Sequence, residues 1–131
     1  MSAFFDTNVL YYLTQTLSDK RPVARRVVLA GGVISPQVLN EFADATRRKL
    51  RLSWDEIMEW REMILLTCEV VPMTGQSQAK ALEIAQNHQL HIYDANIWAA
   101  AILAGCETLY SEDMHDGLTI EGTTLRNPFG G

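Results

Sequence analysis

The sequence predicts an α/β fold in which a central parallel sheet of four to five short strands is flanked by helices. Short apolar runs alternate with amphipathic stretches of helical periodicity along the chain. The runs are continuously apolar, as expected of strands that are covered on both faces of a parallel sheet. The chain has 131 residues, of which 47% are hydrophobic. This length and composition predict a single domain over residues 1–131.

The first elements are read from apolar runs and breaker residues. A strand over residues 2–6 passes directly into a helix whose apolar positions continue to Leu17. Pro22 is suited to the start of a second helix, which runs to about Ala30. The residues after the following glycines, 33–35, form a second buried strand.

Two capping signals place the next helices. Ser35 followed by Pro36 is typical of an N-cap with proline at the first helical position, and this helix runs to about Leu50. Ser53 and Glu56 form a capping box that starts another helix. The apolar residues expected on the buried face of that helix are Trp54, Ile57, Met58, Ile64, Leu65 and Cys68.

The second half of the chain continues the alternation. A helix over 76–88 is expected to turn Ala79, Leu82 and Ala85 inward. Residues 94–104 have almost no polar face, so this segment is predicted to be a central, buried helix. The remaining strands are expected at 69–71, at 108–111 and, as a short late strand, near Ile120 and Leu125.

Charge and composition exclude several classes of protein. With 11 Lys and Arg against 16 Asp and Glu, the net charge of −5 argues against broad electrostatic coating of nucleic acid. No apolar run reaches the ~18 residues of a membrane span, and no signal peptide is visible. Two cysteines are too few for a disulfide framework. We therefore expect a cytoplasmic protein without a membrane partner.

The cations are unevenly distributed. Most of the 11 lie between positions 20 and 51, namely Lys20, Arg21, Arg25, Arg26, Arg47, Arg48, Lys49 and Arg51. Such a cluster is compatible with a phosphate-contacting face. Taken alone, the cluster is more simply interpreted as ordinary solvated helix surfaces.

Acidic residues stand where the predicted strands meet the following helices. Asp6 closes the first strand, Glu41 lies one turn inside the helix after the second, Asp94 opens the central helix, and Asp113 follows the fourth strand. Carboxylates that converge near a core need partners, raised pKa values or a cation. Mg²⁺ or Mn²⁺ suits such oxygen ligands. Taken singly, each acid also has an ordinary interpretation as a helix cap, a turn residue or a solvent-exposed side chain.

Four blocks of sequence in order carry a resemblance to a known family. DTNVL at 6–10, SPQVLNEF at 35–42, YDANIWAAA at 93–101 and LYSEDMHDG at 109–117, with NPF at 127–129, resemble the PIN domain of VapC-type toxins. The resemblance spans nearly the whole chain and implies a three-layer PIN-like fold. It implies a divalent-metal-dependent endoribonuclease that leaves a 5′-phosphate and a 3′-hydroxyl, as the toxin of a toxin–antitoxin pair.

The resemblance also implies roles for individual residues. Asp6, Glu41, Asp94 and Asp113 would form the catalytic acidic site, and Asp6, Asp94 and Asp113 would hold the Mg²⁺ or Mn²⁺. Glu112, Asp113 and Asp116 are all candidates for the last acid position, of which we favour Asp113. The residues expected in supporting roles are Asn8, Ser111 and Asp116. Arg47, Arg48 and Lys49 would then be possible RNA contacts.

The sequence also leads to expectations about binding partners and to two alternative functions. The resemblance implies an RNA substrate, a homodimer and an antitoxin whose C-terminal segment lies in a groove near the acids. One alternative is a non-catalytic PIN-like module that binds RNA or protein. Another is a Mg²⁺-dependent phosphomonoesterase, which would want a second Asp two residues after Asp6, where the sequence has Asn8. The sequence does not identify the RNA target.

Overall fold

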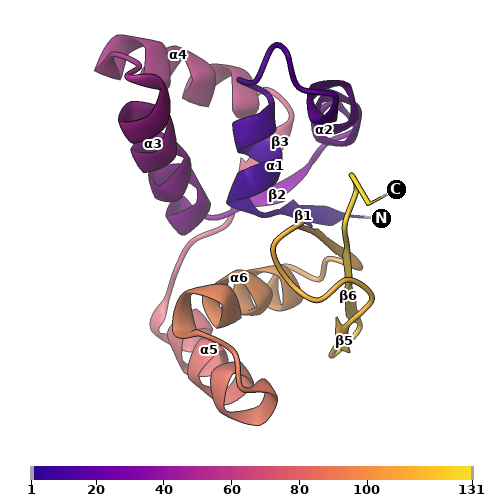
Figure 1. The fold of residues 1–131 in the computed structure, drawn as a ribbon. Coiled ribbons are helices and arrows are strands. Elements are labelled where there is room, and N and C mark those ends of the chain that lie inside the picture. The colour runs from indigo at the N-terminus through magenta and orange to yellow at the C-terminus, as the bar shows by residue number, and fades with distance from the viewer. Residues whose placement is uncertain (1, 131) are drawn as a thin grey trace.

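The computed structural model describes residues 2–130 and forms a sheet with helices on both faces (Figure 1). The strands are β1 Ala3–Phe5, β2 Gly32–Ile34, β3 Cys68–Val70, β4 Thr108–Tyr110, β5 Thr119–Ile120 and β6 Thr123–Arg126. The helices are α1 Thr7–Tyr12, α2 Lys20–Leu29, α3 Pro36–Leu50, α4 Trp54–Ile64, α5 Gly75–His88 and α6 Ile92–Leu103. The predicted α/β class is confirmed.

The sheet order is β3-β2-β1-β4-β6-β5, and its pairs are parallel except for the antiparallel pair β5 and β6. The described residues form six strands; the five that pair in parallel, β3, β2, β1, β4 and β6, agree with the predicted parallel sheet of four to five strands, and β5 is an additional antiparallel strand. The additional strand arises because the late segment is a hairpin. Glu121 and Gly122, with φ values of 47° and 89°, make the tight turn between its two strands.

Helices α1 to α4 lie on one side of the central strands, and α5 and α6 lie on the other (Figure 1). Helix α6 has the buried position that its sequence predicts. Its fully buried residues include Trp98, which is 0% exposed, and the small side chains Ala95, Ala99 and Ala101. These alanines allow α6 to lie close to its neighbours. Within residues 2–130, no helix is long and apolar enough to cross a membrane.

The predicted caps are confirmed. Ser35 is the N-cap of α3, and its Oγ accepts a hydrogen bond from the backbone N–H of Val38 at 3.4 Å. At the start of α4, the Ser53 Oγ accepts from the Glu56 N–H at 3.1 Å, while the Glu56 Oε1 accepts from the Ser53 N–H at 2.9 Å. Cap formation fixes where α3 begins and hence where Glu41 lies.

The first helix is shorter than predicted. Helix α1 ends at Tyr12, and Leu17 is 99% exposed. Side chains take the carbonyl oxygens that a longer helix would use. The Thr14 Oγ1 donates to the Tyr11 carbonyl oxygen at 2.7 Å, and the Arg21 Nε donates to that of Leu13 at 2.9 Å.

Two predicted helix faces are shifted. Trp54 and Met58 are 65% and 54% exposed, because α4 lies at the margin of the fold and buries mainly Ile57 and Ile64. In α5, Leu82 is 52% exposed, and the buried residues are instead Ser77, Ala81 and Ile84. The buried face of α5 is therefore rotated from the one that the apolar pattern indicated.

The close approach of β2 to β1 requires Gly32, and this gives a test of the central sheet. A Cβ at this position would lie 2.5 Å from the Phe5 ring and 2.6 Å from the Ala3 carbonyl oxygen, which is backbone. We expect Gly32→Ala to lower the free energy of unfolding by about 2–4 kcal/mol in urea titrations. Gly75→Ala is the matched control, because nothing lies within 4 Å of its Cβ. Its effect should be neutral or stabilising by less than about 1 kcal/mol. Equal stability of the two variants would contradict this packing.

Candidate metal-dependent nuclease site

Asp6 stands at the carboxyl end of β1, where it is only 8% exposed. It is the N-cap of α1, and its Oδ1 accepts a hydrogen bond from the Thr7 N–H at 2.7 Å. Its Oδ2 accepts from the Ser111 Oγ at 2.7 Å and from the Asn8 Nδ2 at 3.4 Å. The buried carboxyl is thus held by donors that carry no charge.

The electrostatic position of Asp6 is unfavourable for a carboxylate. Burial raises its pKa from an ordinary 3.8 to about 6, despite the hydrogen bonds from Ser111 and Thr7. The nearby negative charges of Glu41 and Asp113 are smaller contributions to the same rise in pKa. At neutral pH the folded protein therefore keeps a buried negative charge at a cost in free energy.

The other candidate acids surround Asp6 in a cleft of about 270 Å³, whose lining includes Glu41, Asp94 and Asp113. Glu41 comes from α3, Asp94 from the first turn of α6, and Asp113 from the loop after β4. All three are exposed. The Glu41 Oε1 accepts a hydrogen bond from the Thr7 Oγ1 at 2.8 Å. The structure thus brings together the four acids that the sequence singled out.

Asn8 and Ser111 connect the acids at the centre of the cleft. The Asn8 Nδ2 lies 3.1 Å from both the Ser111 Oγ and the Asp113 Oδ2. The Ser111 Oγ also accepts from the backbone N–H of Asp113 at 3.1 Å. Each of these two side chains contacts two carboxyl-bearing residues and carries no charge itself, so their geometry suits them to positioning Asp6 and Asp113.

The three candidates for the last acid position lie in different surroundings. Asp113 lines the cleft. Glu112 forms an ion pair of 2.6 Å with Lys20 and accepts a hydrogen bond from the Tyr12 hydroxyl at 2.5 Å. The Asp116 Oδ1 accepts from the backbone N–H of Asn127 at 2.9 Å. Among the three, only Asp113 combines a position in the cleft with contact to Asn8.

The sequence reasoning missed the ion pair of Lys20 and Glu112. Lys20 also lies over the rings of Tyr12 and Phe129, at 4.9 and 5.7 Å from their centroids. These contacts anchor the loop that carries Asp113 to α1, α2 and the C-terminal segment. Because Lys20 and Glu112 are 92 positions apart, no local sequence signal could have indicated the pair.

The cleft offers carboxylate oxygens as possible ligands of a divalent cation. In residues 2–130 no three His, Cys, Asp or Glu side chains lie close enough together to form a complete ligand set as they stand. Arg48 lines the cleft, but its Nε pairs with the Asp44 Oδ2 at 2.9 Å. An open cleft of several carboxylates fits Mg²⁺, which usually binds through one or two carboxylates and keeps several waters.

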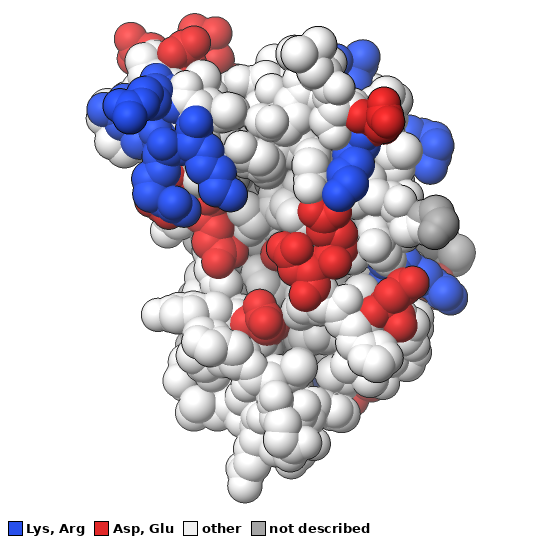
Figure 2. Space-filling model, in the orientation of Figure 1, with Lys and Arg blue, Asp and Glu red and all other residues white. Residues whose placement is uncertain are grey.

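Charge is strongly segregated on this face of the molecule. Figure 2 shows acidic side chains gathered in its centre and a group of Lys and Arg side chains to the upper left, over the end of α3. That helix carries Arg47, Arg48 and Lys49 in its last turn. The Arg47 Cζ lies 4.8 Å from the centroid of the Trp54 ring, and the Lys49 Nζ lies 5.1 Å from the centroid of the Tyr11 ring. The basic end of α3 thus adjoins the acidic cleft at Arg48, which lines the cleft.

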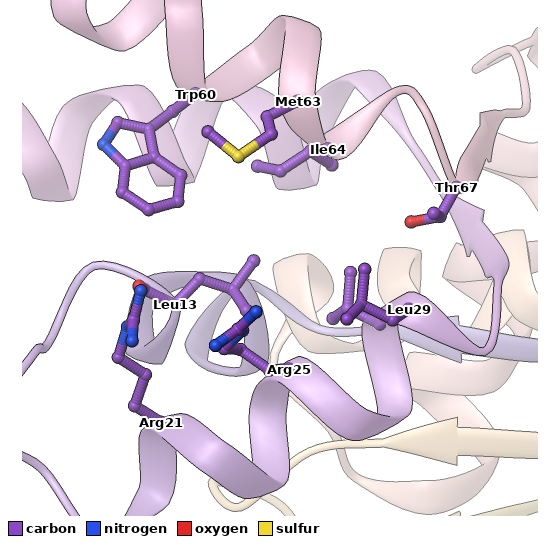
Figure 3. A pocket seen from close by; sticks show the side chains of 9 residues that line it. Leu13, Arg21, Arg25, Leu29, Trp60, Met63, Ile64 and Thr67 are labelled. Atoms are coloured by element: carbon purple, nitrogen blue, oxygen red, sulfur yellow. The ribbon is translucent and has the colours of Figure 1, made fainter.

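A separate cavity of about 260 Å³ lies between α2 and α4 (Figure 3). Apolar side chains such as Leu29, Met63 and Ile64 line it together with Trp60. Arg21 and Arg25, both from α2, also line it. None of the four candidate acids lines this cavity, so it is distinct from the acidic cleft.

Comparison with known proteins supports the interpretation of the fold. A structure of the VapC20 toxin of Mycobacterium tuberculosis, described as cleaving the sarcin–ricin loop, is 20% identical with a TM-score of 0.69. The match covers 86% of this chain and 92% of that one. A toxin–antitoxin complex from Klebsiella pneumoniae is 24% identical with a TM-score of 0.74, over 98% of both chains.

A third similar structure is VapBC2 from Rickettsia felis bound to a promoter DNA fragment, with 16% identity and a TM-score of 0.73. This match covers 97% of the chain and 98% of that one. No curated protein matches the chain significantly. The sequence model of the PIN domain family matches residues 3–115, a range that includes all four candidate acids. The chain therefore belongs to the PIN domain family.

Proposed function

We propose that this PIN domain, over residues 1–131, is a divalent-metal-dependent endoribonuclease and the toxin of a toxin–antitoxin pair. The observation that carries the proposal is the convergence of Asp6, Glu41, Asp94 and Asp113 from four separate parts of the chain into one open cleft. The burial of Asp6 and the negative charges of Glu41 and Asp113 near it raise the free energy of the cation-free fold. Membership of the PIN family and the similar folds of toxins support the same function.

In this proposal Asp6, Asp94 and Asp113 hold Mg²⁺ or Mn²⁺. When bound, the cation lowers the pKa of a coordinated water and neutralises charge on the phosphodiester. Ser111 and Asn8 fix the carboxyl groups of Asp6 and Asp113 by hydrogen bonds. Glu41, oriented by the Thr7 hydroxyl, also lines the cleft. Its exposed carboxylate can accept a proton from an attacking water.

The partners follow from the same proposal. Similar structures are toxin–antitoxin complexes, which supports a cognate antitoxin for this chain. The apolar cavity between α2 and α4, with arginines beside it, favours a protein partner with apolar and acidic side chains on that face. We also propose a homodimer that acts on RNA in the cytoplasm. The non-catalytic module remains the alternative outcome of the first test below.

Removal of one acid tests catalysis. We expect Asp94→Asn to lower metal-dependent cleavage of a structured RNA pool by at least about 100-fold, because the cleft loses an anionic ligand. Product ends are measured for wild type and variant in Mg²⁺, Mn²⁺ and EDTA. Glu59→Gln is the matched control, since it removes one exposed charge on α4 and should cleave like wild type.

Cleavage that persists in EDTA or in Asp94→Asn would point to a contaminating nuclease. A folded wild-type protein that binds RNA but does not cut it would favour the non-catalytic module.

The raised pKa of Asp6 predicts a pH-dependent effect on stability. In the absence of divalent cation, its contribution to the free energy of unfolding is greatest below pH 3.8 and declines as the pH rises to about 6. Asp6→Asn should therefore be more stable than wild type above pH 6, by up to about 3 kcal/mol. This advantage should vanish near pH 4, and Mg²⁺ or Mn²⁺ should raise the Tm of wild type only. Thermal unfolding at several pH values checks this, and a variant less stable than wild type at pH 8 without metal would contradict it.

The cations at the end of α3 are tested by the salt dependence of RNA binding. Replacement of Arg47, Arg48 and Lys49 by Gln should reduce the steepness with which the logarithm of the RNA-binding constant falls with the logarithm of the salt concentration. The expected reduction in slope is about 0.7 for each lost phosphate contact, and up to about 2 in total. The matched control replaces Arg25, Arg26 and Arg61 by Gln, with the same change of charge on α2 and α4. Equal slopes in the two triple variants would assign the α3 cations to a solvated surface.

A further inference from the structure

A second hollow continues from the acidic cleft. It has a volume of about 410 Å³ and shares Gln37, Glu41 and Asp44 with the cleft. Its lining is completed by Asn40, Met73 and Tyr93. A group bound between the acids would therefore have this side compartment directly beside it.

Two exposed side chains that are not part of the hydrophobic core, Tyr93 and Met73, line this compartment. Tyr93 is 64% exposed and immediately precedes Asp94, and Met73, in the segment before α5, is 46% exposed. The Tyr93 ring packs against His91, with 5.3 Å between ring centroids and 31° between their planes. An exposed aromatic ring held beside a candidate catalytic acid is suited to stacking.

Polar side chains of α3 also line the compartment, and hydrogen bonds hold one of them, Gln37, in place. The Gln37 Nε2 donates to the Tyr93 carbonyl oxygen at 3.2 Å, and its Oε1 accepts from the Asn96 Nδ2. These bonds tie α3 to the start of α6 and hold the two walls together. The Asn40 side chain is exposed and makes no hydrogen bond within the described residues. Its amide is free to contact a ligand.

We propose that this compartment binds an unpaired nucleobase next to the scissile phosphate, with the base stacked on Tyr93 and its edge facing Asn40. This inference rests on the proposed function and names its substrate class as single-stranded or looped RNA. Sequence-specific recognition of RNA uses such splayed bases, through aromatic stacking and hydrogen bonds to the base edge.

The charges of the compartment favour a base over an apolar protein side chain. Glu41 and Asp44 line it beside Asn40. Carboxylate and amide oxygens accept hydrogen bonds from exocyclic amino groups, whereas an inserted aliphatic side chain would leave them without donors. We therefore expect a preference for adenine, cytosine or guanine over uracil at this position.

Cleavage of a random-sequence single-stranded RNA pool in Mg²⁺ or Mn²⁺ tests the inference. Tyr93→Leu should lower kcat/KM by about 5- to 100-fold and weaken the base preference at one position flanking the cut. Tyr93→Phe keeps the ring and should retain the base preference that Tyr93→Leu loses. An abasic nucleotide at the same position should reduce cleavage by wild type but add little to the loss in Tyr93→Leu.

The outcomes separate this inference from the proposed function. If wild type cleaves and Tyr93→Leu has unchanged kcat/KM and base preference, the base site is wrong while the nuclease stands. If Tyr93→Leu changes the oligomeric state in light scattering but not the base preference, the surface belongs to a second copy, and the base site is again overturned.

If wild type cuts no RNA, the proposed nuclease fails, and binding decides the base site. Oligonucleotides with 2-aminopurine at single positions report stacking without cleavage. Fluorescence quenching by wild type and Tyr93→Phe, but not by Tyr93→Leu, supports the base site. Equal quenching by the three proteins overturns it.

Discussion

The parallel pairing of β1 with β4 is the constraint on which the rest of the cleft depends. Its register places Phe5 opposite Tyr110, so the next residues, Asp6 and Ser111, leave the sheet side by side. The backbone N–H of Asp6 donates to the Tyr110 carbonyl oxygen at 3.0 Å, which extends the pairing to the edge of the cleft. A shift of one residue would turn Asp6 to the opposite face of the sheet. The hydrogen bond from Ser111 to Asp6 exists only in this register.

The acidic cleft shows a conflict between stability and function. Folding forces Asp6 into a buried position close to Glu41 and Asp113, where a carboxylate is unfavourable. Hydrogen bonds from neutral donors hold the group without neutralising it. The nearby cations are paired with other acids. Lys20 pairs with Glu112, just outside the cleft, and Arg48 pairs with Asp44, which lines the cleft. A bound cation would relieve this repulsion, which explains why such an arrangement can persist in a marginally stable fold.

Local sequence signals predicted much of this structure. The features that depend on long-range contacts could not be predicted from them. The caps at Ser35 and Ser53 and the burial of α6 are properties of short segments, and the structure confirms them. The grouping of the four acids could also be anticipated, because the carboxyl ends of parallel strands share one edge.

By contrast, the early end of α1 depends on Arg21, which reaches back to the Leu13 carbonyl oxygen. The exposure of Trp54 depends on how α4 packs against α3, which its own periodicity does not show. The ion pair of Lys20 with Glu112 exists only once the chain has folded. Each of these features is set by tertiary contacts, so the pattern of a single segment does not contain it.

The charge distribution would also restrict how the proposed nuclease recognises RNA. A net charge of −5 repels a polyanion at long range, but at physiological ionic strength this repulsion is screened beyond about 8 Å. Recognition must therefore rely on local contacts, and the cleft provides two kinds. Cations at the end of α3 reach the acids at Arg48, and the hollow with Tyr93 adjoins the cleft at Glu41 and Asp44. An RNA strand that satisfies both would place its backbone on the basic side and a base on the aromatic side. The phosphate between them would then lie over the acids, where the divalent cation of the proposed function would offset the repulsion between phosphate and carboxylates.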